Sequence, residues 1–385
     1  MSRYTTPEPF KINVADAVLA DLRERLLRVR WPGEIPNSGW DYGTNLAYMK
    51  KLVDYWRTDY DWRLHEQQLN RWPQFRVTID GQQLHYIHAR GKGPKPFPLI
   101  ITHGWPGSIA EFMAIIGPLS DPAAHGGDPL DAFDVIAPSL PGYGFSAPTN
   151  ERQVNIAHIG EWFAVLMNKV LGYVRYGAQG GDWGAMVTSR LGFIDAEHVA
   201  GIHLNMVGVA AHPANRQHLS AAEHAYLKVM EQWRNEETGY QGIQGTKPQT
   251  LSYALNDSPL GLCAWIIEKF RTWSDCGGDL EGAYTRDQLL TNIMIYWVTQ
   301  TINSSTRLYY EERHHPWRMG KDDKITVPTA LALFPKEIAV PPREWAERAY
   351  NIQRWTPMPA GGHFAAMEQP QLLVEDVRAF FRTLR

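Results

Sequence analysis

Cysteine is scarce in this chain: only Cys263 and Cys276 occur among its 385 residues. Two cysteines do not make a disulfide framework, so we expect a reducing compartment. Long apolar runs are missing as well, because no uninterrupted apolar stretch approaches the ~18 residues of a membrane span. The opening residues, MSRYTTPEPFKINVADAV, carry charges and prolines in place of the apolar core of a signal peptide. We therefore expect a soluble, cytoplasmic protein without a membrane anchor.

An excess of charge is also absent. The formal net charge is −3 and no block of like charges forms a tail, so nothing predicts a nucleic-acid partner. Internal repeats and low-complexity segments are lacking too. Aromatic residues, in contrast, are plentiful, with 15 tryptophans and 17 tyrosines. This excess is compatible with an aromatic core and also with an apolar ligand pocket.

Residues 1–74 predict an N-terminal extension, helical and irregular, that packs on another part of the chain. Between residues 11 and 28, apolar side chains recur at helical spacing, with charged residues on the other face. Residues 46–69 again predict a helix, which carries two tryptophans. The stretch between these helices, WPGEIPNSGWDYG, is irregular.

Residues 75–207 change to a pattern of strand, loop and helix. A hairpin signal comes first, because two β-rich runs flank Asp80-Gly81. Continuous apolar strands then alternate with helical stretches, which is typical of a mostly parallel sheet with helices on both faces. In such sheets, ligands bind beyond the carboxyl ends of the strands. The four apolar runs are FPLIITHGWPGS, FDVIAPSLPGYGFS, YVRYGAQGGDWG and VAGIHLNMV.

Residues 208–319 interrupt this rhythm. They look helical, are rich in tryptophan and tyrosine, and contain no clear buried strand. The runs ITVPTALALFPKE and YNIQRWTPMPAGGHF then resume the strand pattern, and an amphipathic helix beginning at Pro370 closes the chain. We interpret 208–319 as a helical cap, or lid, inserted into one α/β domain that is formed by 75–207 and 320–385.

The pentapeptide GGDWG has the form of a nucleophile elbow, a strand-to-helix turn so sharp that its neighbours must be small. Gly180 and Gly184 supply the small residues, and Asp182 stands where a serine would indicate an esterase. A carboxylate at this position attacks an alkyl carbon and leaves an ester on the enzyme. The plainer alternative is that Asp182 only caps the following helix, since aspartate is a favoured N-cap.

The loop HGWPGS directly follows an apolar strand. Such a loop can aim a backbone N–H, here that of Trp105, at an oxyanion beside the elbow. The second donor of this oxyanion hole would be the N–H of Trp183, directly after Asp182. A plain strand–helix turn would have the same appearance, and Ser108 with Glu111 forms an S-x-x-E capping box for a following helix.

A base and its orienting acid follow late in the chain. His363, in PAGGHFAAMEQP, comes after the last strand, and Glu337 ends the strand ALALFPKE. The order Asp182, Glu337, His363 is the nucleophile–acid–base order of α/β-hydrolases. Asp322 and Asp323 are rival acids, but they precede the strand and so lie at its wrong end.

The motifs HGWPGS, PGYGFS, GGDWG, FPKE and GGHFAAMEQP together resemble the epoxide hydrolases of the α/β-hydrolase superfamily. The likeness is to the branch of microsomal and juvenile-hormone epoxide hydrolases and their soluble microbial relatives. The stretches RWPGEIPNSGWDYG and YWRTDYDWRLHEQQLNRWPQF are similar to that branch's N-terminal meander, and IQGTKPQTLSYALNDSPLGLCAWIIEKFRTWSD is similar to its lid. The resemblance covers essentially the whole chain. The apolar anchor of the microsomal members is missing, which favours the soluble relatives.

The resemblance also implies two lid tyrosines that donate hydrogen bonds to the epoxide oxygen. Tyr240 in EETGYQGIQ and Tyr309 in SSTRLYYEER occupy those positions, and Tyr310 stays open as the second donor. The chemistry needs such donors, because a strained ether opens to an alkoxide that a phenol can stabilise or protonate. For either tyrosine alone, packing in an aromatic lid is the simpler reading.

The sequence thus predicts hydrolysis of an epoxide to a vicinal diol through an ester on Asp182, which water activated by His363 and Glu337 then cleaves. No metal or organic cofactor is implied. A small epoxide with an apolar or aryl substituent is the expected substrate, and a homodimer is compatible with the soluble relatives. Detoxification, as in the catabolism of aromatic hydrocarbons, and biosynthesis both stay open. The alternatives are a haloalkane dehalogenase, in which Trp183 would bind halide, and a lidded protein that binds a hydrophobic ligand without catalysis.

Overall fold

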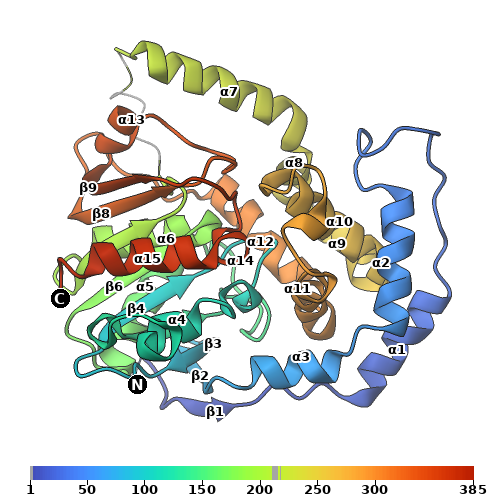
Figure 1. Cartoon of the computed structure of the whole chain (residues 1–385), viewed down its shortest axis with the longest axis horizontal. Coiled ribbons are helices and arrows are strands. Elements are labelled where there is room, and N and C mark those ends of the chain that lie inside the picture. The colour runs from blue at the N-terminus through green and yellow to red at the C-terminus, as the bar shows by residue number, and fades with distance from the viewer. Residues whose placement is uncertain (1–2, 210–215, 217) are drawn as a thin grey trace.

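A nine-stranded sheet runs through the centre of the molecule, in a computed structural model that describes residues 3–209, 216 and 218–385 (Figure 1). The strand order is β1-β2-β3-β5-β4-β6-β7-β8-β9. Pairing is antiparallel from β1 to β5 and parallel from β5 to β9. The strands are β1 (Glu8–Phe10), β2 (Gln74–Ile79), β3 (Gln82–Ala89), β4 (Phe97–Thr102), β5 (Phe133–Pro138), β6 (Tyr176–Gly180), β7 (Val199–Leu204), β8 (Ile325–Leu333) and β9 (Tyr350–Pro357).

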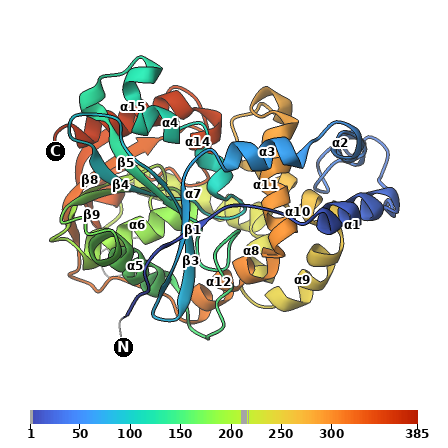
Figure 2. The ribbon, with the colours of Figure 1, turned by 90° about the horizontal axis from the view of Figure 1, so that it is seen from below.

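Helices cover both faces of this sheet, as the continuous apolar strands predict. Every residue of β6 and β7 is buried, which requires a layer on each side. Figure 2 shows α4 (Ile116–Ser120) and α15 (Pro370–Phe381) on one side, with α5 (Ile156–Val165) and α6 (Asp182–Ile194) on the other. Along the chain, the short helix α13 (Arg343–Glu347) precedes β9 and the short helix α14 (Ala365–Glu368) follows it. The predicted α/β-hydrolase architecture is therefore confirmed.

The described residues of the N-terminal section form three helices and one strand. Its helices are α1 (Asp16–Leu27), α2 (Leu46–Thr58) and α3 (Trp62–Leu69). The prediction of a single helix over 46–69 is wrong at one point, because α2 ends at Thr58. A new helix, α3, then begins, and the side chain of Asp61 caps it by accepting the N–H of Arg63. The section is also more than a helical extension, since β1 joins the edge of the main sheet.

Six α-helices form the described part of the inserted unit between β7 and β8. They are α7 (Ala221–Glu237), α8 (Gly239–Gln244), α9 (Pro248–Asp257), α10 (Pro259–Trp273), α11 (Arg286–Thr299) and α12 (Ile302–His314). The predicted start of the cap at residue 208 adjoins residues 210–215 and 217, which lie outside the described residues. Within the described parts of the chain, no helix combines the length and apolar character of a membrane span.

The N-terminal helices brace this cap from the side away from the sheet (Figure 2). Helix α2 packs against α11, and α1 packs against α10. The Arg25 guanidinium pairs with Asp257 at 2.8 Å, and the Tyr55 hydroxyl donates to Asp287 at 2.9 Å. Exposed polar pairs contribute little stability by themselves, so the buried faces of the helices hold the cap in place.

Candidate active site

Asp182 lies at a sharp turn between β6 and α6. Its φ of +49° is in the left-handed region, which residues other than glycine seldom adopt. The turn closes only because its neighbours are glycines. A Cβ on Gly180 would overlap the carbonyl of Gly184, and a Cβ on Gly184 would overlap the carbonyl oxygen of Thr102. The sequence GGDWG therefore forms the sharp elbow that it predicts.

The carboxylate of Asp182 is held on both oxygens. Its Oδ1 accepts the backbone N–H of Trp105 at 2.8 Å, and its Oδ2 lies 3.2 Å from Nε2 of His363. The N-cap residue of α6 is Gly181, and no side chain caps that end. The helix-capping interpretation of Asp182 is therefore wrong. The N–H of Trp183 is among the first donors of α6, which have no acceptor within their own helix.

His363 is fixed from two sides. Its Nδ1 lies 2.6 Å from Oε1 of Glu337, and its backbone N–H donates to the carbonyl of Trp273, at the end of cap helix α10, at 2.9 Å. The rival acids stay remote from this histidine because they lie in the exposed turn before β8, where Asp323 accepts the N–H of Gly320. The structure thus brings Asp182, Glu337 and His363 together.

The charge of His363 is controlled by its neighbours. Burial opposes protonation of the imidazole, but the charges of Glu337 and Asp182, with their hydrogen bonds, outweigh it and raise the pKa of His363 well above its usual value. The histidine is therefore an imidazolium that pairs with Asp182 while the aspartate is free. Loss of the negative charge on Asp182 would remove part of this stabilisation.

Two tyrosines of the cap lie over the elbow. The Tyr240 ring stacks on Trp105 with centroids 5.3 Å apart, and the Tyr309 ring meets Trp183 edge-on at 4.8 Å. The two phenol rings are 5.8 Å apart. Tyr310, in contrast, is 36% exposed and stacks on His314. The structure therefore places Tyr309, and not Tyr310, beside Tyr240.

Both of these phenols stay protonated. Burial raises the pKa of Tyr240 and of Tyr309 well above the usual value for tyrosine, and the charge of Asp182 raises both further. A neutral phenol carries an O–H donor. Since the rings lie near Asp182, an oxygen atom that leaves a carbon attacked by this carboxylate would meet two donors.

A cavity of about 300 Å³ opens onto these groups. Trp183, Met186, Met206 and Ile338 supply apolar walls. The polar functions come from the carboxylate and the two phenols, together with Gln241, Glu312 and Arg313. This combination of apolar walls and a few convergent polar groups is typical of sites for small organic ligands.

The cap also positions the loop that carries the Trp105 N–H. In α11, the amide of Asn292 donates to the carbonyl of Pro106 at 2.7 Å and accepts the Ser108 hydroxyl at 2.7 Å. One turn later, the Tyr296 hydroxyl donates to the carbonyl of Gly107 at 2.7 Å. Sequence reasoning missed both α11 residues, because nothing in the local pattern of α11 links it to a loop more than 180 residues earlier.

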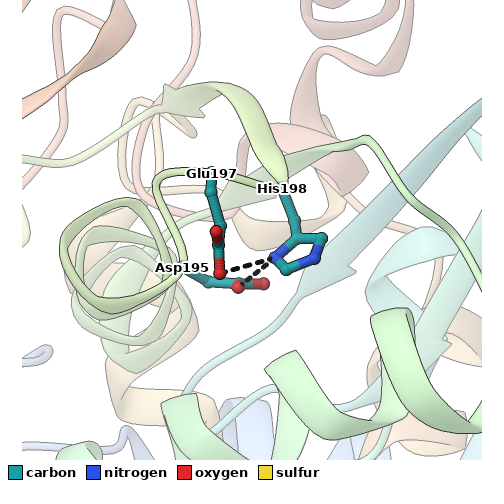
Figure 3. A group of neighbouring side chains, drawn as sticks. All are labelled: Asp195, Glu197 and His198. Atoms are coloured by element: carbon teal, nitrogen blue, oxygen red, sulfur yellow. Dashed lines mark hydrogen bonds and ion pairs between the residues drawn. The ribbon is translucent and has the colours of Figure 1, made fainter.

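One further cluster has the residue types of a metal site. Oxygen atoms of Asp195 and Glu197 and a ring nitrogen of His198 lie within 4.8 Å of one another (Figure 3). The Asp195 carboxylate is already engaged, since it accepts the Tyr176 hydroxyl at 2.7 Å and lies 2.6 Å from Nδ1 of His198. These bonds tie the end of α6 to the start of β6 and to the residue before β7, which accounts for the cluster as part of the fold.

Comparisons with known proteins identify the family to which the chain belongs. The family model described as epoxide hydrolase N terminus matches residues 7–112, and that of the alpha/beta hydrolase fold matches residues 98–383. A Stigmatella aurantiaca protein, provisionally named an epoxide hydrolase, is 45% identical over 98% of this chain and 85% of its own. Epoxide hydrolase 1 of Oryctolagus cuniculus is 38% identical over 97% of this chain and 88% of its own.

Solved structures give the same result. The juvenile hormone epoxide hydrolase of the silkworm Bombyx mori superposes with a TM-score of 0.89 at 32% identity, covering 99% of this chain and 95% of that one. The Aspergillus niger epoxide hydrolase superposes with a TM-score of 0.85 at 28% identity, covering 99% of this chain and 97% of that one. The similarity therefore extends over the sheet, the cap and the N-terminal helices together.

Proposed function

Because the chain belongs to the epoxide hydrolases of the α/β-hydrolase fold, in the microsomal and juvenile-hormone branch, we propose that it forms a vicinal diol through a covalent ester on Asp182. One arrangement carries this proposal: the Asp182 carboxylate lies between the Trp105 N–H and the His363–Glu337 pair, with two buried phenols nearby.

The first step is attack on the epoxide. Since Oδ1 of Asp182 is held by the Trp105 N–H, Oδ2 is the atom that bonds to the epoxide carbon while the carbon–oxygen bond of the ring breaks. Tyr240 and Tyr309 donate hydrogen bonds to the developing alkoxide. In the net balance, the alkoxide gains the proton that His363 gives up, since the ester no longer carries the negative charge that stabilised the imidazolium.

The second step is hydrolysis of the ester. Neutral His363, oriented by Glu337, removes a proton from water, whose oxygen attacks Cγ of Asp182. The N–H groups of Trp105 and Trp183 stabilise the oxyanion. The ester bond to the alkyl oxygen then breaks, the leaving alkoxide takes the carboxyl proton, and the diol departs. The sum is one epoxide plus one water, and the enzyme returns with Asp182 ionised and His363 protonated.

The shape of the cavity supports a small substrate with an apolar or aryl substituent. A volume of about 300 Å³ is at the lower limit of sites for small organic ligands. Trp183, Met186 and Met206 line it with aromatic and flexible thioether surface. Methionine adapts to ligands of differing outline, so we expect several epoxides of this class to be accepted.

The test is diol formation from a panel of aryl and alkyl epoxides, with Asp182→Ala as the matched variant. We expect diol from the wild type and none from the folded variant. Bromide release from a short bromoalkane, without diol from any epoxide, would instead favour the haloalkane dehalogenase. Tight binding of epoxides without turnover of any of them would favour the non-catalytic binding protein.

A further inference from the structure

The cavity beside Asp182 also carries a positive charge, which the reaction scheme leaves unused. Its lining includes Arg313, in the last turn of α12. Tyr309 lies one turn earlier in the same helix and lines the same cavity. Residues four apart share one face of a helix and are about 6 Å apart along its axis. A substrate whose epoxide oxygen meets Tyr309 can therefore extend towards Arg313 with its other end.

A glycine makes room for this arginine. Helices α8 and α12 pack together, and Gly245, which directly follows α8, lines the cavity as well. A Cβ at Gly245 would lie 3.0 Å from Cδ and 3.5 Å from Nη1 of Arg313, so a side chain at this position would press on the arginine. Because the glycine has none, the stem of Arg313 lies directly against the backbone of the cavity wall.

The guanidinium of Arg313 has no hydrogen-bond or ion-pair partner within the part of the chain that the structure describes. An arginine keeps its charge at every pH at which the fold exists. A cation in the last turn also complements the helix dipole, but that interaction does not require a place in the wall of a cavity. The side chain is therefore free to bind an anion that enters there.

The acids of the same cavity do not neutralise this charge. The Asp182 carboxylate pairs with His363. The Glu312 carboxyl accepts the N–H of Trp317 at 2.9 Å and that of Ile156 at 3.3 Å. Burial raises the pKa of Glu312 to about 7, although these two N–H groups oppose the shift. Both acids thus have partners of their own.

We propose that Arg313 is a specificity-determining residue that binds a carboxylate at the far end of the epoxide substrate, an inference that rests on the proposed function. The planar guanidinium matches a carboxylate with two parallel N–H···O bonds. The apolar walls of the cavity, which include Trp183 and Met186, would hold the aryl or alkyl spacer between the two ends. The preferred substrates are then small epoxides that carry a carboxylate.

The test compares two aryl epoxides that differ in charge and hardly in shape, 4-(oxiran-2-yl)benzoate and 4-(oxiran-2-yl)benzamide. The readout is the ratio of kcat/KM for the benzoate to kcat/KM for the benzamide, measured as diol formation by the full-length enzyme at low ionic strength. Arg313→Gln removes the charge, and Arg313→Lys keeps it without the planar fork. Arg28→Gln, at the exposed end of α1, is the matched control for loss of one positive charge.

We expect a ratio of about ten in the wild type, as for one charge-assisted pair that is partly open to water. Arg313→Gln should bring the ratio close to one, and Arg313→Lys should give an intermediate ratio. Arg28→Gln should keep the wild-type ratio. The effect should appear mainly in KM, since the carboxylate is remote from the reacting atoms and is bound equally in ground state and transition state. Loss of structure alone would lower both rates and leave the ratio unchanged.

Four outcomes would overturn the inference: a wild-type ratio near one, an Arg313→Gln ratio as high as that of the wild type, an Arg313→Lys ratio no higher than that of Arg313→Gln, or an equal fall in Arg28→Gln. Failure of the proposed function has a different signature, because the wild type would then form no diol from the benzoate, from the benzamide or from any uncharged epoxide of the panel.

Discussion

Asp182 and His363 form an ion pair in which the carboxylate helps to set the protonation of the buried imidazole. The pKa of His363 lies well above its usual value because of Glu337 and Asp182, in spite of burial. The raised pKa of the folded state means that this pair stabilises the fold fully below about pH 6.5 and loses its contribution as the pH rises through the folded pKa. The same coupling turns His363 into a base once Asp182 is esterified.

This coupling can be measured with Asp182→Asn, which mimics the neutral ester at nearly the same size. We expect the pKa of His363 to fall in the variant, because one of the two negative partners is gone. Titration of the imidazole ¹⁵N signals by NMR gives both values, and Asp323→Asn, in the exposed turn before β8, is the control. Equal His363 pKa values in wild type and Asp182→Asn would contradict the account.

The role of the lid tyrosine Tyr309 can be tested by comparison with its neighbour Tyr310. Tyr309→Phe removes a buried donor beside Asp182, whereas Tyr310→Phe removes an exposed hydroxyl. We expect formation of the ester to slow by about 10²–10³ in Tyr309→Phe, the usual effect of losing one oxyanion donor. Tyr310→Phe should keep the wild-type rate. The reverse pattern in rapid-quench kinetics would exchange the roles of the two residues.

Some site residues are predictable from sequence and others are not, for a physical reason. Asp182, Glu337 and His363 each follow a strand of a parallel sheet, and the carboxyl ends of such strands meet at one edge. No such rule applies to Asn292 and Tyr296 of α11. Their neighbours depend on how the cap seats on the sheet, and only the folded chain specifies that contact.

At the scale of elements, the N-terminal helices act through the cap. In α2, Met49, Leu52, Val53 and Trp56 are buried at helical spacing and the helix packs on α11. Helix α11 in turn holds the loop of Trp105 through Asn292 and Tyr296. The extension therefore supports the oxyanion loop through α11.

Leu52→Ala tests this support. Leu52 is 1% exposed, so its truncation should destabilise the protein by about 2–5 kcal/mol, the usual cost of emptying a packed leucine site. Leu27, at the end of α1, is 59% exposed, and Leu27→Ala should stay within about 0.5 kcal/mol of wild type. Urea unfolding gives both values. A Leu52→Ala protein as stable as Leu27→Ala would show that the α2–α11 contact is not a supporting one.

The elements themselves were largely predictable. The hairpin at Asp80-Gly81 and the apolar strands β4 to β9 follow from their residue pattern. The break between α2 and α3 was missed because Tyr60 and Trp62 continue the apolar pattern across it, while the Asp61 cap, which starts a new helix, is one polar residue in that run.

At the scale of the whole molecule, the sheet, the cap and the extension together build the site around one carboxylate, that of Asp182, which lines the cavity. The sequence predicts the architecture because repeated strands and helices leave few ways to form the sheet. Cavities depend instead on where side chains of different elements stop short of contact, which no local pattern records. Cytoplasmic location and a homodimer stay predictions.

The central claim is the ester on Asp182, and a single turnover in H₂¹⁸O tests it most directly. With enzyme in excess over epoxide, the diol oxygen that comes from outside the substrate should be Oδ2 of Asp182. The account therefore predicts unlabelled diol in the first turnover and one ¹⁸O atom left in the Asp182 carboxylate, both read by mass spectrometry. Label in the diol of the first turnover, with none in Asp182, would mean that water attacks the epoxide directly.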